Sequence, residues 1–327
     1  MRRSASEKLE LIRLVEGSDL PVKQTLRQLG ISRSTFYGWY RRYLEDGVDG
    51  LEDRKPAARR HWNQIPDTVR AEVVELALEQ TELSPRELAC QYTDQRSHFI
   101  SESSVYRILK AYDLITSPAY VLLSAADSFK HPTRRVHELW QTDFTHLHVI
   151  GWGWYYLSTV LDDFSRFIIA WRLSATMSAT DAKETLDEAL AVSGVEQVRV
   201  RHRPRLLSDN GPAYVSKELQ TYLQERGIGH TRGAPYHPMT QGKIERYHRT
   251  MKNVVKLQHY HFPWEVEHAI EEFVSYYNNE RYHESLDNVT PADVYHGRHH
   301  QVLSERARIK RLTMQRRKKL NLAVQAA

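Results

Sequence analysis

Trp140-Gln-Thr-Asp143-Phe-Thr145 lies within a run, His137 to Ile150, in which apolar and polar residues alternate as in a β-strand. The glycines of Gly151-Trp-Gly153 predict a turn after this run. Further strands are expected at 155–161, 166–172, 205–208 and 228–232, and helices at 180–192, 213–225, 241–259 and 264–278. Three consecutive strands followed by alternating helices and strands predict a mixed α/β domain, which we place at residues 136–297.

Three carboxylates stand at the edges of these expected elements. Asp143 lies mid-strand among apolar residues, where a charge is costly unless it binds a partner. Asp209 ends a strand in Ser208-Asp-Asn-Gly211, at the edge where open α/β sheets place their ligands. Glu245 lies on a helix, with 35 residues between it and Asp209. Carboxylate oxygens are the ligands that hard divalent cations prefer, so Asp143, Asp209 and Glu245 are predicted to be metal ligands and catalytic residues.

The helix that carries Glu245 also carries basic residues. Lys252 follows Glu245 by seven residues and therefore falls on the same helix face two turns later. A lysine beside metal-bound carboxylates suits a phosphate substrate, so Lys252 is a candidate phosphate contact. Two arginines of this helix are further candidate DNA contacts: Arg246 and Arg249. The nearby His237 and His248 are expected to pack or to touch phosphate, because Mg²⁺ prefers oxygen ligands.

Residues 1–45 are expected to form a helix-turn-helix DNA-binding domain of three short helices. Ser4-Ala-Ser-Glu7 is a capping-box pattern, Pro21 suits the first turn of a second helix, and Ser32 caps a third after Gly30. In a helix-turn-helix motif the start of the second helix enters the major groove. The residues predicted to contact DNA are Arg33, Ser34, Thr35, Tyr37 and Arg41. The alternative is a small helical bundle that serves packing only.

Residues 65–115 are expected to form a second helix-turn-helix domain. Ser84-Pro-Arg-Glu87 combines a capping box with proline at the first helical position. Ile31-Ser-Arg-Ser-Thr-Phe-Tyr37 also aligns with Ile100-Ser-Glu-Ser-Ser-Val-Tyr106, which suggests two related units in tandem. Arg107 is the candidate DNA contact here. Segments 46–64, which is basic, and 116–135 are expected to be linkers.

The charge distribution agrees with this organisation. The chain has 327 residues and a net charge of +5, but residues 1–62 carry 13 Lys and Arg against 9 Asp and Glu, and residues 298–327 carry 9 against 1. Basic ends around an acidic middle suggest polyanion binding at the ends and cation binding in the centre. The basic C-terminal tail, 298–327, is expected either to lie on phosphates or to be a helix that orders only on DNA.

The sequence also bounds the environment. No run approaches the roughly 20 apolar residues of a membrane helix, and no apolar segment follows Met1-Arg-Arg-Ser4, so neither a membrane span nor a signal peptide is expected. The single cysteine, Cys90, excludes an internal disulfide and fits a reducing cytoplasm. We therefore expect a cytoplasmic protein that associates with the nucleoid when it is bound to DNA.

Several segments resemble bacterial insertion-sequence transposases that have a retroviral-integrase-like core. The resemblance covers nearly the whole chain and rests on these segments: 140–145, 156–166, 208–212, 237–252, 277–283 and 290–295. The Asp, Asp, Glu motif with its 35-residue spacing is the most specific of these features. The chain departs from the family at Tyr282, where proline is more common. It also lacks the zinc module of retroviral integrases, so no structural zinc is expected.

The resemblance implies an RNase H-like fold and DDE chemistry. Asp143, Asp209 and Glu245 would hold two Mg²⁺ ions, for which Mn²⁺ can substitute, and Asp162 would stabilise a turn. The implied function is a DNA transposase that binds the terminal repeats of a transposon and cleaves and joins DNA strands. Because a transposon has two ends and one chain has one site, a homodimer or larger complex on double-stranded DNA is expected.

Two other functions stay open on the sequence. A metal-dependent nuclease would use the same carboxylates to cut DNA without joining it. A catalytically inactive helix-turn-helix regulator would bind DNA only, although the presence of all three carboxylates and Lys252 speaks against a decayed core.

Overall fold

The computed structural model describes residues 4–18, 20–52, 61–115, 133–195, 203–233, 242–256 and 259–326. Several features expected from the sequence lie outside the described residues: the basic run 54–60 of the first linker, most of the second linker, and His237. The chain divides into two compact units, Met1–Trp62 and Asn63–Ala327. Within the described residues, no helix is both long and apolar enough to span a bilayer.

The first unit is helical and has its own core. It contains α1 (Ala5–Glu16), α2 (Val22–Gln28), α3 (Arg33–Asp46) and the 3₁₀ helix η1 (Gly47–Leu51). The side chain of Ser4 accepts a hydrogen bond from the backbone of Glu7 and the side chain of Glu7 accepts one in return, which is the expected capping box. Ser32 caps α3 through the backbone N–H of Thr35. The buried core consists of Ile12, Val15, Leu26, Ile31, Phe36 and Leu51.

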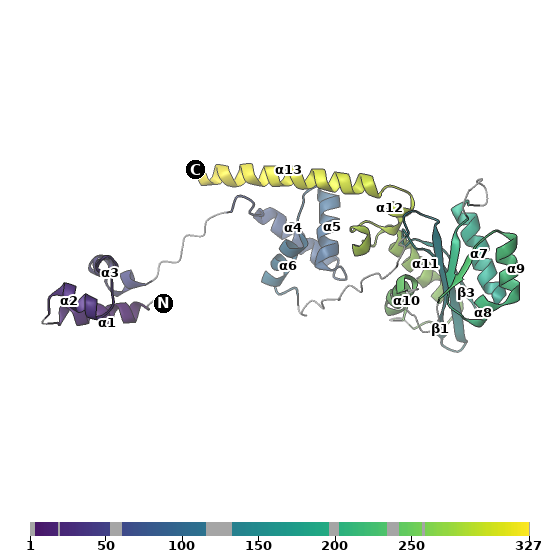
Figure 1. Ribbon diagram of the computed structural model, residues 1–327, viewed down its shortest axis with the longest axis horizontal. Coiled ribbons are helices and arrows are strands. Elements are labelled where there is room, and N and C mark those ends of the chain that lie inside the picture. The colour runs from purple at the N-terminus through teal and green to yellow at the C-terminus, as the bar shows by residue number, and fades with distance from the viewer. Residues whose placement is uncertain are drawn as a thin grey trace. The chain divides into compact units, whose positions relative to one another are not determined.

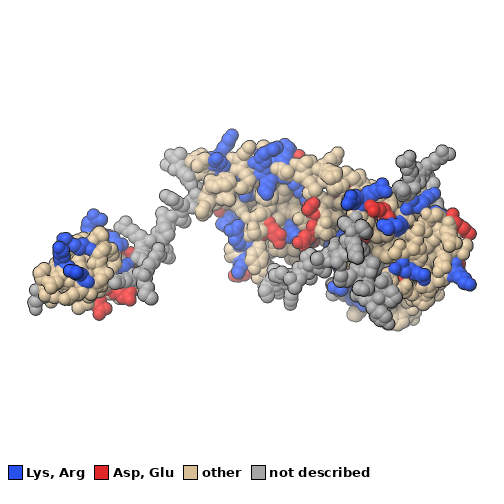
Figure 2. Space-filling view, viewed as in Figure 1, with Lys and Arg blue, Asp and Glu red and all other residues tan. Residues whose placement is uncertain are grey.

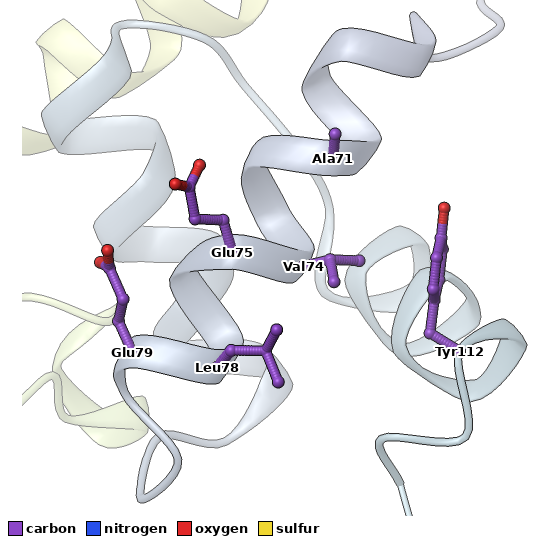
Figure 3. A pocket seen from close by; sticks show the side chains of 6 residues that line it. All are labelled: Ala71, Val74, Glu75, Leu78, Glu79 and Tyr112. Carbon is purple, nitrogen blue, oxygen red and sulfur yellow. The ribbon is translucent and has the colours of Figure 1, made fainter.

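The second unit begins with three more helices: α4 (Asp67–Glu79), α5 (Pro85–Arg96) and α6 (Glu102–Ala111). The expected capping box of Ser84 and Glu87 is present, whereas Ser101 precedes α6 without a side-chain cap. Val73, Tyr92, Val105 and other buried residues form a core of their own. On the outer side of these helices lies a groove of about 430 Å³, lined by Val74, Leu78 and other α4 residues and by Tyr112 beyond α6 (Figure 3).

A five-stranded sheet in the order β3-β2-β1-β4-β5 forms the centre of the second unit (Figure 1). The strands are β1 (Leu139–Val149), β2 (Gly153–Asp162), β3 (Ile168–Ser174), β4 (Arg205–Ser208) and β5 (His230–Arg232). The first three strands pair antiparallel, and β4 and β5 add on in parallel. The chain therefore combines a helical N-terminal region with a mixed α/β domain, as predicted.

Helices pack on both faces of the sheet. One core joins the sheet residues Trp140, Val160 and Leu206 to α7 (Ala179–Ser193) and α9 (Lys217–Glu225). The other joins Leu147, Leu157 and Ile168 to helices α10 (Gly242–Val255) and α11 (Pro263–Asn279). Side chains in a strand alternate between its two faces. Asp143 is four residues before Leu147 and therefore lies on the same face, which α10 covers.

The helices of the second unit differ from the expected ones in two places. Residues 213–225 do not form one helix, because Ser216 takes an extended conformation and caps α9, leaving α8 (Pro212–Val215) as a separate short turn. Two short helices were not expected from the sequence: η3 (Glu284–Leu286) and α12 (Pro291–Tyr295).

β3 is an edge strand of the sheet. At its first residue, Ile168, the outward backbone groups bond to a side chain and not to another strand. The backbone N–H of Ile168 donates to the side-chain oxygen of Asn278 at 2.9 Å, and the Asn278 amide donates back to the Ile168 carbonyl at 3.0 Å. Asn278 is buried near the end of α11, so α11 is tied to the edge of the sheet by both bonds.

The C-terminal basic segment is a 28-residue helix, α13 (His299–Ala326), and part of it is buried against the second unit (Figure 1). The buried residues recur every fourth position: Ile309, Thr313, Arg317 and Asn321. Thr313 accepts a hydrogen bond from the backbone of Phe99, and Arg317 donates to the Phe99 carbonyl. The helical alternative expected for the tail is therefore present, and these contacts hold one stripe of the helix against the helices before the sheet.

Candidate active site

The sheet brings two of the three predicted carboxylates together. Gln141 of β1 pairs with Leu207 of β4 in a parallel register. Two residues further along each strand come Asp143 and Asp209, so both carboxylates lie at the same level of adjacent strands. Asp143 is mid-strand in β1, whereas Asp209 follows the last residue of β4.

The turn after β4 fixes the Asp209 carboxylate. Its oxygen accepts a hydrogen bond from the backbone N–H of Gly211 at 2.9 Å. A Cβ atom at position 211 would lie 3.0 Å from one Asp209 carboxylate oxygen and 3.3 Å from the other, so a larger residue there would crowd the carboxylate. The Asn210 side chain donates to the Gly233 carbonyl, and the Ser208 hydroxyl contacts the His230 ring at 2.8 Å. These two contacts hold the turn against β5.

The electrostatics of this pair favour a cation. Burial raises the pKa of Asp209, the Gly211 hydrogen bond opposes that rise, and the negative charge of Asp143 raises the pKa further. A divalent cation between the two carboxylates would relieve both the desolvation and the repulsion. The donor set, which consists of hard carboxylate oxygens, fits Mg²⁺ or Mn²⁺.

Polar contacts hold the start of α10 against β1 and the turn that follows β2. The backbone N–H of Ile244 donates to the side-chain oxygen of Gln141 at 3.2 Å, and the Gln141 amide donates to Asp163 at 2.7 Å. Lys243 forms a nearly buried ion pair with Asp163 at 2.7 Å. Gln141 is two residues before Asp143 on the same strand face, so this network joins the helix of Glu245 to the strand of Asp143.

Glu245 is exposed in the first turn of α10. In the described parts of the chain, no three His, Cys, Asp or Glu side chains are grouped closely enough to share a metal ion. The structure thus brings Asp143 and Asp209 together and places Glu245 on the helix that packs beside them, without completing a three-ligand cluster.

The basic residues of α10 differ in their surroundings. Lys252 is partly buried, and burial lowers its pKa, as does Lys256, while the Asp143 carboxylate acts in the opposite direction. Lys252 is therefore close enough to Asp143 for their charges to interact. The other two candidates of this helix are exposed: Arg246 and Arg249.

Asp162 stabilises a turn, as the resemblance implies. Its carboxylate accepts hydrogen bonds from the backbone N–H and the hydroxyl of Ser165 and from the backbone N–H of His137. The parts played by Gln141, Asp163 and Lys243 were not predicted from the sequence. The sequence signal available was the adjacent pair Asp162 and Asp163 at the end of a strand. It did not reveal that Asp163 would pair with Lys243, which is 80 residues away.

The candidate DNA contacts of the first unit lie on α3 and are exposed. Arg33, Tyr37 and Arg41 recur every fourth residue and therefore share one face of the helix. Ser34 and Thr35 both bond to the Ser32 hydroxyl, so they also take part in the cap. In the second unit, Arg107 is exposed on α6 and donates to the Ser103 carbonyl.

The exposed face of α13 is basic. No acidic residue follows Glu305 in this helix, and Figure 2 shows Lys and Arg side chains along the side of the second unit where α13 lies. The exposed cations opposite the buried stripe include Arg311, Lys318 and Lys319. Arg306 and Arg317 instead make internal contacts, so only part of the charge faces solvent.

Matches to protein families agree with both the α/β domain and the helical N-terminal region. Residues 133–238 match an integrase core domain, and residues 226–291 match a second model of the same description. Residues 7–60 match a helix-turn-helix domain, and residues 35–109 match a homeodomain-like domain.

Similar curated proteins are retroviral polyproteins. The chain is 34% identical over 119 residues to the Gag-Pro-Pol polyprotein of sheep pulmonary adenomatosis virus, which covers 36% of this chain. It is 30% identical over 148 residues, or 43% of this chain, to the Gag-Pol polyprotein of koala retrovirus. The aligned regions span 6% and 8% of those polyproteins. Among solved structures, the magnesium complex of the HTLV-2 integrase catalytic core domain is 21% identical, with a TM-score of 0.40, over 50% of this chain and 98% of that chain.

Proposed function

We propose that this chain, which carries an integrase core domain behind helix-turn-helix and homeodomain-like domains, is a DNA transposase. It would bind transposon ends and catalyse strand cleavage and strand transfer by a DDE mechanism. The observation that carries the proposal is the pair Asp143 and Asp209, side by side on β1 and β4, with the helix of Glu245 held against the same strand face.

Asp143, Asp209 and Glu245 are proposed to hold two Mg²⁺ ions. When bound, such ions activate a water or a DNA 3′-hydroxyl and stabilise the leaving 3′-oxygen. The part played by the chain itself is to orient the carboxylates: Gly211 holds Asp209, and the Gln141 contact holds the start of α10. Lys252, beside Asp143, would contact a phosphate of the reacting DNA end.

The DNA-binding surfaces are proposed to lie on both units. The exposed face of α3 would enter the major groove of the terminal repeat, and Arg107 of α6 would contact a second part of it. Arg311, Lys318 and Lys319 of α13 would follow the phosphate backbone, which would make binding weaken steeply with salt. A dimer or larger complex on DNA, acting on the nucleoid in the cytoplasm, completes the proposal.

The test is a strand-transfer assay. Purified protein is incubated with Mg²⁺, a plasmid target and labelled duplexes copied from the DNA on either side of its gene. We expect cleaved and joined products from the wild type, and a loss of both by more than about 100-fold in Glu245→Gln, because even changes to residues that merely support a metal ligand cost 10- to 100-fold. The exposed Glu267→Gln of α11 is the matched control and should react normally.

The other outcomes separate the alternatives. Metal-dependent cleavage without joined product would identify a nuclease. Tight binding of the end duplex with no reaction in the wild type would point to a DNA-binding regulator and contradict the transposase proposal.

A further inference from the structure

His248 connects the two strands and the helix of the candidate active site. It is buried in α10, three residues after Glu245. Its Nδ1 lies 3.4 Å from a carboxylate oxygen of Asp143, and its Nε2 lies 3.2 Å from the Thr159 hydroxyl. Asp143 and Thr159 are direct partners in the β1–β2 register. One imidazole therefore faces both members of a cross-strand pair.

The three groups are chemically complementary. A hydroxyl can donate to or accept from an imidazole nitrogen, so the Thr159 hydroxyl can pair with Nε2 in either tautomer of the ring. An imidazole N–H is a donor and a carboxylate oxygen is an acceptor, so Nδ1 suits the Asp143 oxygen that it faces. The hydrogen bond to Thr159 and the contact with Asp143 together hold the ring between β1 and β2.

The same contact also fixes the register of α10. Ile244, just before Glu245, bonds to Gln141 of β1, and His248, just after it, faces Asp143 of β1. These two contacts lie on either side of Glu245 and on one face of one strand. A rotation of α10 that moved Glu245 would therefore have to break at least one of them.

We propose that His248 is a positioning residue that orients Asp143 for metal binding and, through α10, sets the place of Glu245. This inference rests on the proposed function, because it assigns His248 a role at the same metal site. Partners that hydrogen-bond to a metal-ligating carboxylate hold it in the orientation that the metal requires. His248 acts in this way through Asp143 and is not itself a ligand.

The experiment measures Mn²⁺ binding to the full-length protein directly, by electron paramagnetic resonance without DNA, alongside the Mg²⁺ dependence of cleavage. We expect His248→Ala to weaken Mn²⁺ binding about 10- to 100-fold and to raise the Mg²⁺ concentration for half-maximal rate by a similar factor. His248→Asn, whose amide N–H can take the place of Nδ1, should recover most of the affinity. Thr159→Val, which keeps the side-chain shape, should lose less than His248→Ala.

Controls separate positioning from packing. His268→Ala, at an exposed histidine of α11, should bind Mn²⁺ like the wild type. If His248→Ala binds Mn²⁺ like the wild type, or if His248→Asn is as weak as His248→Ala, the positioning role is overturned. If the wild type itself binds no Mn²⁺, or if Glu245→Gln binds it unchanged, the failure lies with the proposed metal site.

Discussion

Asp143 lies opposite Thr159 of β2 and faces His248 of α10. The local sequence pattern indicated where Asp143 and Asp209 stand, because a charged residue in an apolar strand and a carboxylate at a strand end are visible in it. That the two residues are catalytic stays a prediction. The pattern did not indicate the contacts of His248, because they depend on which residue of β2 lies opposite Asp143. That register is set by pairing across the hairpin and by how α10 packs, neither of which a local pattern contains.

His283 leads to a prediction at the residue scale. It packs edge-on against Tyr277 at 4.9 Å between ring centres. Burial, together with the nearby charges of Arg281 and Arg166, lowers the pKa of His283 from an ordinary value of 6.5 to about 3. The unfolded chain thus takes up a proton below pH 6.5 that the folded chain does not, so stability is complete above pH 6.5 and is lost as the pH falls toward 3.

Replacing His283 by glutamine should reduce this loss. Between pH 6.5 and 5, the free energy of unfolding of the wild type should fall more steeply than that of His283→Gln, by up to about 1.4 kcal/mol per pH unit. Urea unfolding at several pH values measures both slopes. Parallel slopes for the two proteins would show that His283 is not the group that takes up the proton.

At the scale of elements, the helix starts were largely predictable and α13 was not. Ser4, Ser32 and Ser84 cap their helices through contacts within four residues, which a sequence displays directly. The buried stripe of α13 contains Thr313, Arg317 and Asn321, so it lacks the apolar periodicity that indicates a packed helix. Its partners lie more than 200 residues away, which no local pattern reveals.

Asp94 of α5 makes a polar contact between α13 and the rest of the second unit. Its carboxylate accepts two hydrogen bonds from Arg306, at 2.7 and 2.6 Å, and one from the Tyr282 hydroxyl at 2.9 Å. The Arg306 guanidinium also lies over the Tyr282 ring, 5.2 Å from its centre. Tyr282, which departs from the family pattern, therefore belongs to the contact that joins α5, α13 and the core.

We predict that Asp94→Asn lowers the free energy of unfolding by about 1–3 kcal/mol, because it leaves the half-buried Arg306 without a carboxylate. Thermal unfolding measures the effect. Arg308→Gln is the control on the same helix: its pair with Glu305 is exposed on both sides, so its loss should change stability much less than the loss of the Asp94 contact. Equal effects of the two substitutions would contradict a structural role for the Asp94 contact.

At the scale of the whole molecule, the chain consists of two units with separate cores. We predict that removing residues 1–62 leaves the main thermal transition of residues 63–327 within about 2 °C of its original position, because no core residue of the larger unit is lost. The shortened chain should lose most of its preference for end duplexes over unrelated DNA, measured by competition binding. A large shift of the main transition would show that the first unit stabilises the second.

Full-length Arg33→Ala, on the exposed face of α3, is the companion variant for that experiment. It should lose part of the same preference without any change in unfolding. If the preference survives both changes, end recognition resides in the second unit, and the proposed role of α3 in end recognition is wrong.

The paired hydrogen bonds between Asn278 and Ile168 have a consequence for how copies of this protein meet each other. An edge strand offers unpaired N–H and C=O groups that can recruit a strand from another chain. At the start of β3 the Asn278 amide already occupies both groups, as a neighbouring strand would. No further strand can therefore pair with the sheet at this point, so copies of the chain are kept from joining through their sheets there.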